Sequence, residues 1–324
     1  MRALLTQAGV YRPQTPAALS CVHAERGLLD MLKSGIGHDG QLMHASAALE
    51  PVTVYGGGRF TAACLLDPTW GVRDGATYCI SGHIINVTSL MTARTFGGRV
   101  FPHKNLCAPQ QPDVMCATPT FCIMDTCIME MWANPSDSLQ YKKDQLGRML
   151  QNACEGVGAT SPPWMLGDLV LFPCERGIHH WWLAVAEMKN RRIRIVDSIA
   201  HGPAARQRAV QTGKQVADWI AAAEEIVGRN VGAEPFSIFA DADVPQQWNN
   251  VDCGVFTIAN VIAIVAGYDS CNEIDPTQVR EWLLQELYLD GVRTDQCGAH
   301  AACPTLRAAR DKPSLFGSRQ FNDH

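Results

Sequence analysis

The sequence predicts an α+β fold in which a central mixed sheet is flanked by helices. Three strand-like runs follow one another, and residues 188–191, which join the last two, suit a hairpin turn. A long amphipathic pattern and an apolar run then supply helices that can cover the sheet. The strands are predicted over residues 168–172, 181–186 and 192–197, the amphipathic helix over 204–227 and the apolar helix over 257–265.

Further helices are predicted from apolar spacing and from capping residues. Apolar residues recur every three or four positions over residues 121–132, and residues 141–153 are a second helical candidate. Asp275 suits an N-cap and Pro276 suits the first helical position, which predicts another helix from residue 276 onward. The inward face of that helix is expected to carry Val279, Trp282, Leu283 and Leu287.

The chain is expected to divide into three segments. Residues 1–112 contain glycine-rich turns and no repeat or catalytic constellation, so we predict an N-terminal region of unknown fold and function. A proline-rich seam at 107–113 marks the boundary to a domain over residues 113–290, and a polar, loosely ordered tail over 291–324 follows. Within the first segment we expect a helix over 26–32 and strands over 53–55 and 78–87.

Composition and charge exclude several classes of protein. Hydrophobic residues make up 47% and charged residues 18% of the 324 residues, which is typical of a globular chain. A net charge of −5 without a long basic run argues against nucleic acid as a partner. Neither an apolar leader nor a run of about 18 apolar residues is present, so we expect no membrane contact and an intracellular location, nuclear or cytoplasmic. The oligomeric state stays open.

The cysteines do not form a metal-binding pattern. Thirteen are scattered along the chain without one Cys-x-x-Cys pair, whereas structural zinc sites take their ligands as close pairs. A disulfide framework is typical of short secreted chains. Most of these cysteines are therefore expected to be small buried hydrophobes, and we predict no metal and no cofactor.

Cys253 stands out because of its place between a polar turn and an apolar helix. Residues 249–252 are turn-like, so Cys253 meets the unpaired N–H groups and the positive dipole end of the helix, which favour a thiolate. Gln247, six residues upstream, carries an amide that can donate to an oxyanion, and its neighbour Gln246 is the rival. The pattern indicates a cysteine nucleophile with an oxyanion hole.

A thiol nucleophile also needs a base and a group that orients the base. His179 and His180 stand at the head of the strand over 181–186, and Asp197 ends the next strand. If these strands pair as a hairpin, His180 and Asp197 lie at the same end of the ladder. The carboxylate can then accept from one imidazole nitrogen and leave the other for Cys253. We favour His180 as the base, with His179 as the alternative.

Three stretches resemble the ubiquitin-like-protein-specific protease family, the Ulp/SENP group of SUMO proteases, of which adenovirus protease is a distant relative. They are Gly-Ile-His-His-Trp-Trp-Leu-Ala-Val at 177–185, Ile-Val-Asp-Ser at 195–198, and the run from Val-Pro-Gln-Gln to Asp-Cys-Gly-Val-Phe at 244–256. The resemblance covers roughly residues 115–288. It implies a papain-like, adenain-like cysteine protease domain. The implied roles are base for His180, orienter for Asp197, oxyanion donor for Gln247 and nucleophile for Cys253.

The resemblance also implies substrate-binding residues. Trp181 is similar to the indole that roofs the family's narrow channel for a Gly-Gly tail. The family's Trp-Leu-Asn-Asp motif corresponds here to Cys-Ile-Met-Asp at 122–125, so a second channel tryptophan is missing and Phe121 is the candidate substitute. The remaining candidates for substrate binding are Asp125, Trp182 and Trp248. The two tryptophans are either packing or substrate-wall residues.

The implied reaction is hydrolysis of a peptide or isopeptide bond after the C-terminal glycine of a SUMO-like ubiquitin-like modifier. The expected partner is that modifier or its conjugates, and no cofactor is required. Two alternatives stay open for the domain: the same fold acting on another modifier or a polyprotein, or a catalytically silent module that binds ubiquitin-like tails. A further, weaker hypothesis is that residues 1–112 bind a partner and target the protease.

Overall fold

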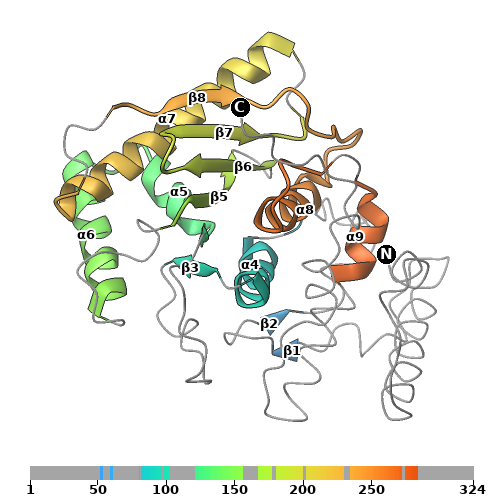
Figure 1. Cartoon of the computed structure of the whole chain (residues 1–324), viewed down its shortest axis with the longest axis horizontal. Coiled ribbons are helices and arrows are strands. Elements are labelled where there is room, and N and C mark those ends of the chain that lie inside the picture. The colour runs from blue at the N-terminus through green and yellow to red at the C-terminus, as the bar shows by residue number, and fades with distance from the viewer. Residues whose placement is uncertain are drawn as a thin grey trace.

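A computed structural model of the chain describes residues 52–53, 59–60, 80, 82–96, 98–101, 121–155, 167–176, 180–199, 202–229, 234–271 and 274–283 (Figure 1). The helix expected over 26–32 and the tail expected over 291–324 lie outside these residues, as do His179 and Leu287.

A six-stranded mixed sheet forms the centre of the fold, as the sequence predicted. Its strand order is β3-β4-β5-β6-β7-β8. The pairs β5/β6 and β6/β7 are antiparallel, whereas β3/β4, β4/β5 and β7/β8 are parallel. The strands are β3 (Arg99–Phe101), β4 (Phe121–Met124), β5 (Leu169–Arg176), β6 (His180–Glu187), β7 (Arg192–Val196) and β8 (Ser237–Ala240). A separate short pair joins β1 (Val52–Thr53) to β2 (Arg59–Phe60).

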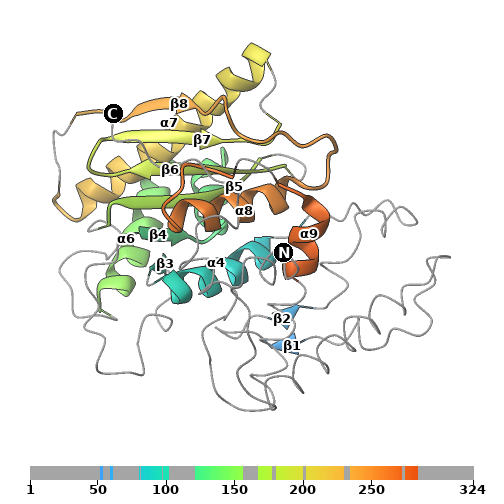
Figure 2. The same ribbon diagram turned by 45° about the vertical axis from the view of Figure 1, so that its right-hand side comes forward.

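Helices cover both faces of this sheet (Figures 1 and 2). One layer consists of α4 (Gly82–Phe96), α8 (Cys253–Val265) and α9 (Pro276–Leu283). The other consists of α5 (Cys127–Ala133), α6 (Leu139–Glu155) and α7 (Gly202–Ile226). The helices predicted over 141–153, 204–227, 257–265 and from 276 onward are thereby confirmed. Within the described parts of the chain, none of the helices combines the length and apolarity that a membrane span requires.

Strand β6 shows how the two layers share the sheet. Trp181, Leu183 and Val185 belong to the apolar clusters on the α8 side. Trp182, Ala184 and Ala186 belong to the cluster on the α7 side. Because both faces are buried, the strand is a continuous apolar run and not an alternation of polar and apolar residues.

The first turn of α8 packs closely against the start of β6. A Cβ atom at Gly254 would lie 2.8 Å from the Ile80 Cβ and 3.3 Å from the Trp181 ring, closer than side chains tolerate. Glycine therefore permits this approach, and every residue of α8 from Cys253 to Ile264 is buried. The position of α8 against β6 brings the helix start to the end of the sheet where β6 begins.

Two predicted elements are wrong. Residues 121–132 are not one helix, because Phe121–Met124 form the interior strand β4 and only Cys127–Ala133 are helical. Residues 82–87 of the strand expected over 78–87 belong to helix α4, which is buried on two sides. A short apolar segment that is buried on two sides has no alternation that would distinguish strand from helix.

The sheet includes residues from both sides of the proline-rich seam at 107–113. Strand β3, before the seam, pairs with β4 after it, and α4 packs against α8. Residues 80–101, where they are described, therefore belong to the same sheet and core as the later segment. The division of the chain into 1–112, 113–290 and 291–324 otherwise stays a prediction.

Candidate active site

Cys253 is the first residue of α8, as the sequence predicted. Asp252 precedes it at the N-cap position, and the loop over 244–252 leads into the helix. The Cys253 side chain is 0% exposed and lies in an apolar cluster with Ile80 and Trp181. The thiol is thus held at the positive end of a helix and away from bulk water.

His180 and Asp197 are in contact at the end of the sheet. The antiparallel pairing of β6 and β7 brings the first residue of β6 beside the residue that follows β7. His180 Nε2 and Asp197 Oδ1 are 2.8 Å apart, and the same oxygen accepts the Ile199 backbone N–H at 2.9 Å. The carboxylate is therefore held in place from two directions, and it occupies one of the two imidazole nitrogens.

The pKa of His180 reflects both of its neighbours. Burial alone would lower this pKa. The hydrogen bond that the imidazole donates to Asp197, an interaction with Cys253 and the negative charges of both groups raise it from 6.5 to about 9. Asp197 occupies Nε2, so the buried Nδ1, which makes no hydrogen bond, is the imidazole nitrogen left for the thiol. His180 is therefore an imidazolium at neutral pH, with Asp197 and Cys253 as its two neighbours.

The two adjacent glutamines differ in their contacts. Gln247 is buried; its Oε1 accepts from the Ser198 hydroxyl at 2.6 Å, and its Nε2 donates to the Asn249 carbonyl. Gln246 Nε2 donates to two carbonyls, those of Asp197 at 3.1 Å and Val244 at 3.0 Å. An amide nitrogen carries two hydrogens, so Gln247 retains one for a further acceptor and Gln246 does not.

A buried ion pair, which sequence reasoning missed, anchors the loop before Cys253. Nε and one terminal nitrogen of Arg280 on α9 donate to Asp252 Oδ1 at 3.0 and 2.8 Å, and the side chains are 5% and 3% exposed. The Asn249 amide donates to the other Asp252 oxygen at 2.6 Å. In the sequence, Arg280 is a cation on the predicted helix that begins at Pro276. Nothing near it in the sequence indicates that its partner is Asp252, 28 residues upstream.

The predicted substrate-binding residues occupy different environments. Trp181 is buried beside Cys253, whereas Trp182 is buried on the opposite face of the sheet. Trp248 follows Gln247 and is 86% exposed. Phe121 lies in the core, where its ring packs against Gly98, and Asp125 accepts the Cys127 backbone N–H. The structure therefore brings Trp181 to the Cys253 group, leaves Trp248 exposed near it and does not bring Phe121 there.

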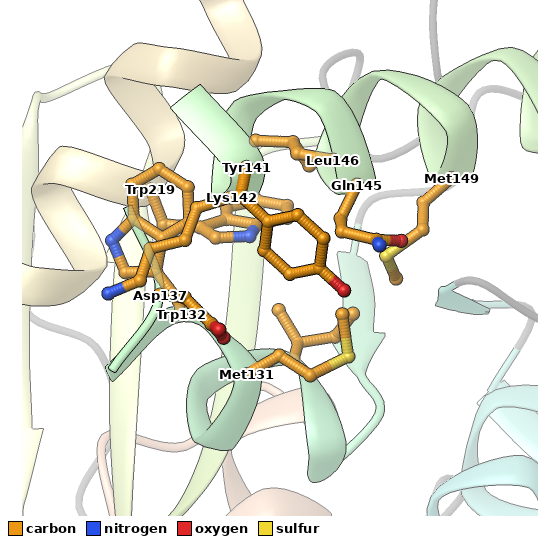
Figure 3. A pocket seen from close by; sticks show the side chains of 10 residues that line it. Met131, Trp132, Asp137, Tyr141, Lys142, Gln145, Leu146, Met149 and Trp219 are labelled. Carbon is orange, nitrogen blue, oxygen red and sulfur yellow. The ribbon is translucent and has the colours of Figure 1, made fainter. Parts of the chain in front are cut away.

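Several hollows lie on the α7 side of the sheet among the described residues. A small one of about 100 Å³ lies behind the histidine–carboxylate contact and is lined by His180, Trp182 and Asp197 together with residues of α7. A larger one of about 300 Å³ lies between α5, α6 and α7, where Met131, Tyr141 and Trp219 surround it (Figure 3). No predicted site residue lines the larger hollow. Among the described side chains, no group of three or more potential ligands could hold a metal ion.

A thiol at a helix start, a histidine beside it and a carboxylate that orients the histidine form the arrangement of the papain-like class of cysteine hydrolases. Residues 113–273 match the model of the Ulp1 protease family, C-terminal catalytic domain. This segment of the chain therefore belongs to that family.

A curated protease is similar to part of this chain. Ubiquitin-like-specific protease 1 of Saccharomyces cerevisiae is 30% identical over 95 residues, which are 29% of this chain. The match spans 14% of the length of that relative.

Solved structures establish the fold. The C-terminal Ulp1 protease domain in complex with Smt3, the yeast ortholog of SUMO, is similar at a TM-score of 0.51 and 15% identity, covering 81% of this chain and 94% of that one. The Chaetomium thermophilum Ulp1-like SUMO protease catalytic domain is similar at a TM-score of 0.53 and 19% identity, covering 84% and 91%.

Replacement of Arg280 by alanine is expected to destabilise the fold strongly, because it leaves the Asp252 carboxylate buried without its cation. We expect a loss of about 3–5 kcal/mol in the free energy of unfolding, measured by urea denaturation. Lys143→Ala is the matched control, since it removes an exposed pair with Glu225 that is worth about 1 kcal/mol or less. Equal losses in both variants would contradict the anchoring role of Arg280.

The imidazole of His180 is expected to titrate near pH 9, which NMR of the ring can measure. In Asp197→Asn the pKa should fall, because the negative charge that raises it is removed and the amide oxygen is a weaker acceptor than the carboxylate. The raised pKa means that the imidazolium contributes stability fully below about pH 6.5, and that this contribution is lost as the pH rises through about 9. A titration near 6.5 in the unmodified protein would contradict this geometry.

Proposed function

We propose that the chain is a cysteine peptidase that hydrolyses the bond after the C-terminal glycine of a SUMO-like modifier. In this proposal Cys253 is the nucleophile, His180 the base, Asp197 its orienter and Gln247 an oxyanion donor. The observation that carries the proposal is the pairing of His180 with Asp197 at 2.8 Å while the same imidazole interacts with Cys253. The family of residues 113–273 supports it.

The first half of the reaction follows from these positions. The Cys253 thiolate attacks the carbonyl carbon of the terminal glycine, and the carbonyl oxygen becomes an oxyanion. The second hydrogen of Gln247 Nε2 and the Cys253 backbone N–H donate to that oxyanion. The C–N bond then breaks, the His180 imidazolium gives its proton to the leaving amine, and a thioester remains on Cys253.

The second half regenerates the enzyme. His180, now neutral, accepts a proton from water, and the water oxygen attacks the thioester carbonyl. The same two donors stabilise the second oxyanion. When the C–S bond breaks, the thiolate and the imidazolium return as a pair. Asp197 keeps its carboxylate throughout, since its part is to hold the ring and stabilise the imidazolium.

Burial of the nucleophile supports a substrate with a thin tail. Cys253 is fully buried and Trp181 packs beside it, so bulky side chains next to the scissile bond would have to displace core residues. Glycine residues have no side chain and can take a narrow path. The yeast Ulp1 domain of similar fold was solved in complex with Smt3, the yeast ortholog of SUMO, which supports the same class of partner for this chain.

One observation favours a different substrate within the same mechanism. Phe121, the candidate for the second channel wall, packs inside the core and away from the Cys253 group. A channel with a single indole wall could accept another ubiquitin-like modifier or a polyprotein site with a small residue before the cut. A silent binding module is less favoured, because such a module needs no contact between His180 and Asp197.

The test is covalent capture by SUMO, a Nedd8-type modifier and ubiquitin, each carrying a C-terminal electrophile. We expect the SUMO probe to form an adduct with the wild type and none with Cys253→Ala, as seen by mass shift. Cys127→Ala is the control. Cys127 is partly exposed, but its burial and the neighbouring Asp125 raise its pKa to about 12, so it should not react.

Other results have separate meanings. Labelling by a different modifier would replace the SUMO-like substrate and keep the mechanism. If no modifier labels the protein but a small alkylating reagent modifies Cys253 selectively, the substrate class is wrong. If Cys253 is also inert, the peptidase proposal fails.

Replacement of Gln247 by alanine is expected to lower kcat by about 100-fold with little change in KM, the usual cost of losing one oxyanion donor. Initial rates on a fluorogenic modifier substrate would measure this. Gln145→Ala on α6, far from Cys253, is the matched control and should leave kcat unchanged. A loss smaller than about threefold for Gln247→Ala would remove the oxyanion role.

A further inference from the structure

The Gln247 amide is held at both ends inside the protein. Ser198 Oγ donates to Oε1 at 2.6 Å, and both side chains are nearly inaccessible to solvent. At the other end, Nε2 donates to the Asn249 carbonyl. The two backbones are also joined, since the Gln247 N–H donates to the Ser198 carbonyl at 2.9 Å. These contacts determine where the amide lies and which end of it is the oxygen.

The orientation of this amide matters for the chemistry. A primary amide has one oxygen and two N–H groups, and an oxygen turned toward a developing oxyanion would repel it. Rotation of the amide by half a turn would bring Oε1 against the Asn249 carbonyl. Two acceptor oxygens would then face each other, which is unfavourable. In the observed orientation Ser198 satisfies the oxygen, Asn249 takes one N–H, and one N–H is left for the substrate.

Asn249 is itself fixed, so the other end of the amide does not depend on Ser198. Its side-chain oxygen accepts the backbone N–H groups of Val251 and Asp252 at 3.0 and 3.1 Å. Its side-chain nitrogen donates to Asp252, which Arg280 holds. Removal of the Ser198 hydroxyl would therefore leave the nitrogen end in place and deprive the buried Oε1 of its donor.

We propose that Ser198 is a positioning residue, whose hydroxyl holds the Gln247 amide with its remaining N–H directed at the oxyanion. This proposal rests on the proposed function, in which Gln247 is the oxyanion donor. Ser198 follows Asp197 directly in the short turn after β7. In this turn Asp197 orients the base His180, and Ser198 orients the oxyanion donor Gln247. The Gln246 contact to the Asp197 carbonyl ties the same turn to the loop before α8.

The experiment is a double-mutant cycle on kcat with a fluorogenic SUMO-like substrate. Ser198→Ala is expected to lower kcat about tenfold with KM changed less than about twofold, since tenfold corresponds to about 1.4 kcal/mol, within the range that one buried hydrogen bond contributes. In the Gln247→Ala background the same change should alter kcat less than about twofold, because there is no amide left to position. Ser198→Thr, which keeps the hydroxyl, should restore most of the rate.

A merely structural role predicts a different pattern. In that case Ser198→Ala would lower kcat equally in both backgrounds, and this result would overturn the proposal. Ser237→Ala on β8 is the matched control, because the Ser237 hydroxyl makes only a long, exposed contact to the Arg191 carbonyl. If Gln247→Ala lowers kcat about 100-fold while Ser198→Ala does not lower it, the Ser198 proposal alone fails. If Gln247→Ala has no effect, the oxyanion role fails first.

A second measurement does not depend on turnover. The side-chain NH₂ resonances of Gln247 in an NMR spectrum, assigned by their loss in Gln247→Ala, report how firmly the amide is held. Ser198→Ala should shift or broaden these resonances, whereas Ser198→Thr and Ser237→Ala should leave them in place. Unchanged Gln247 resonances in Ser198→Ala would overturn the proposal even if no substrate has been identified.

Discussion

The antiparallel pairing of β6 with β7 is the constraint on which the rest of the site depends. It determines which residues meet at the end of the sheet, and there His180 meets Asp197. Burial on both faces holds this register, because a slip of one residue would send the tryptophans and small residues of β6 to the wrong layers. The geometry of the candidate site is therefore specified by the packing of a core strand.

The second half of the site is a loop held from both sides. Ser198 and the Asp197 carbonyl contact its glutamines, and Arg280 holds the Asp252 carboxylate just before Cys253. Each of these groups is buried or half-buried, so hydrogen bonds that would be weak in water have a defined geometry here. Four elements, β6, β7, α8 and α9, thus converge on a loop that has no regular structure of its own.

Much of this could be predicted from the sequence, for identifiable reasons. Strands β5, β6 and β7 are bounded by turns, and Cys253 lies at a sharp change from polar to apolar residues, so local patterns were sufficient. Phe121–Met124 and residues 82–87 were misassigned because they are short or doubly buried and carry no clear period. The contacts of Ser198 and Arg280 join residues 49 and 28 positions apart, and no local pattern announces such partners.

The distribution of these contacts along the chain has a consequence for how the protein can be divided. The family match ends at residue 273, yet Arg280 lies beyond that end, and α4 and β3 lie before its start at 113. A fragment trimmed to the matched residues would keep every proposed catalytic side chain and lose the cation that neutralises Asp252. It would also expose the flank of α8 that α4 covers. The unit that folds is thus wider than the segment that carries the family's motifs.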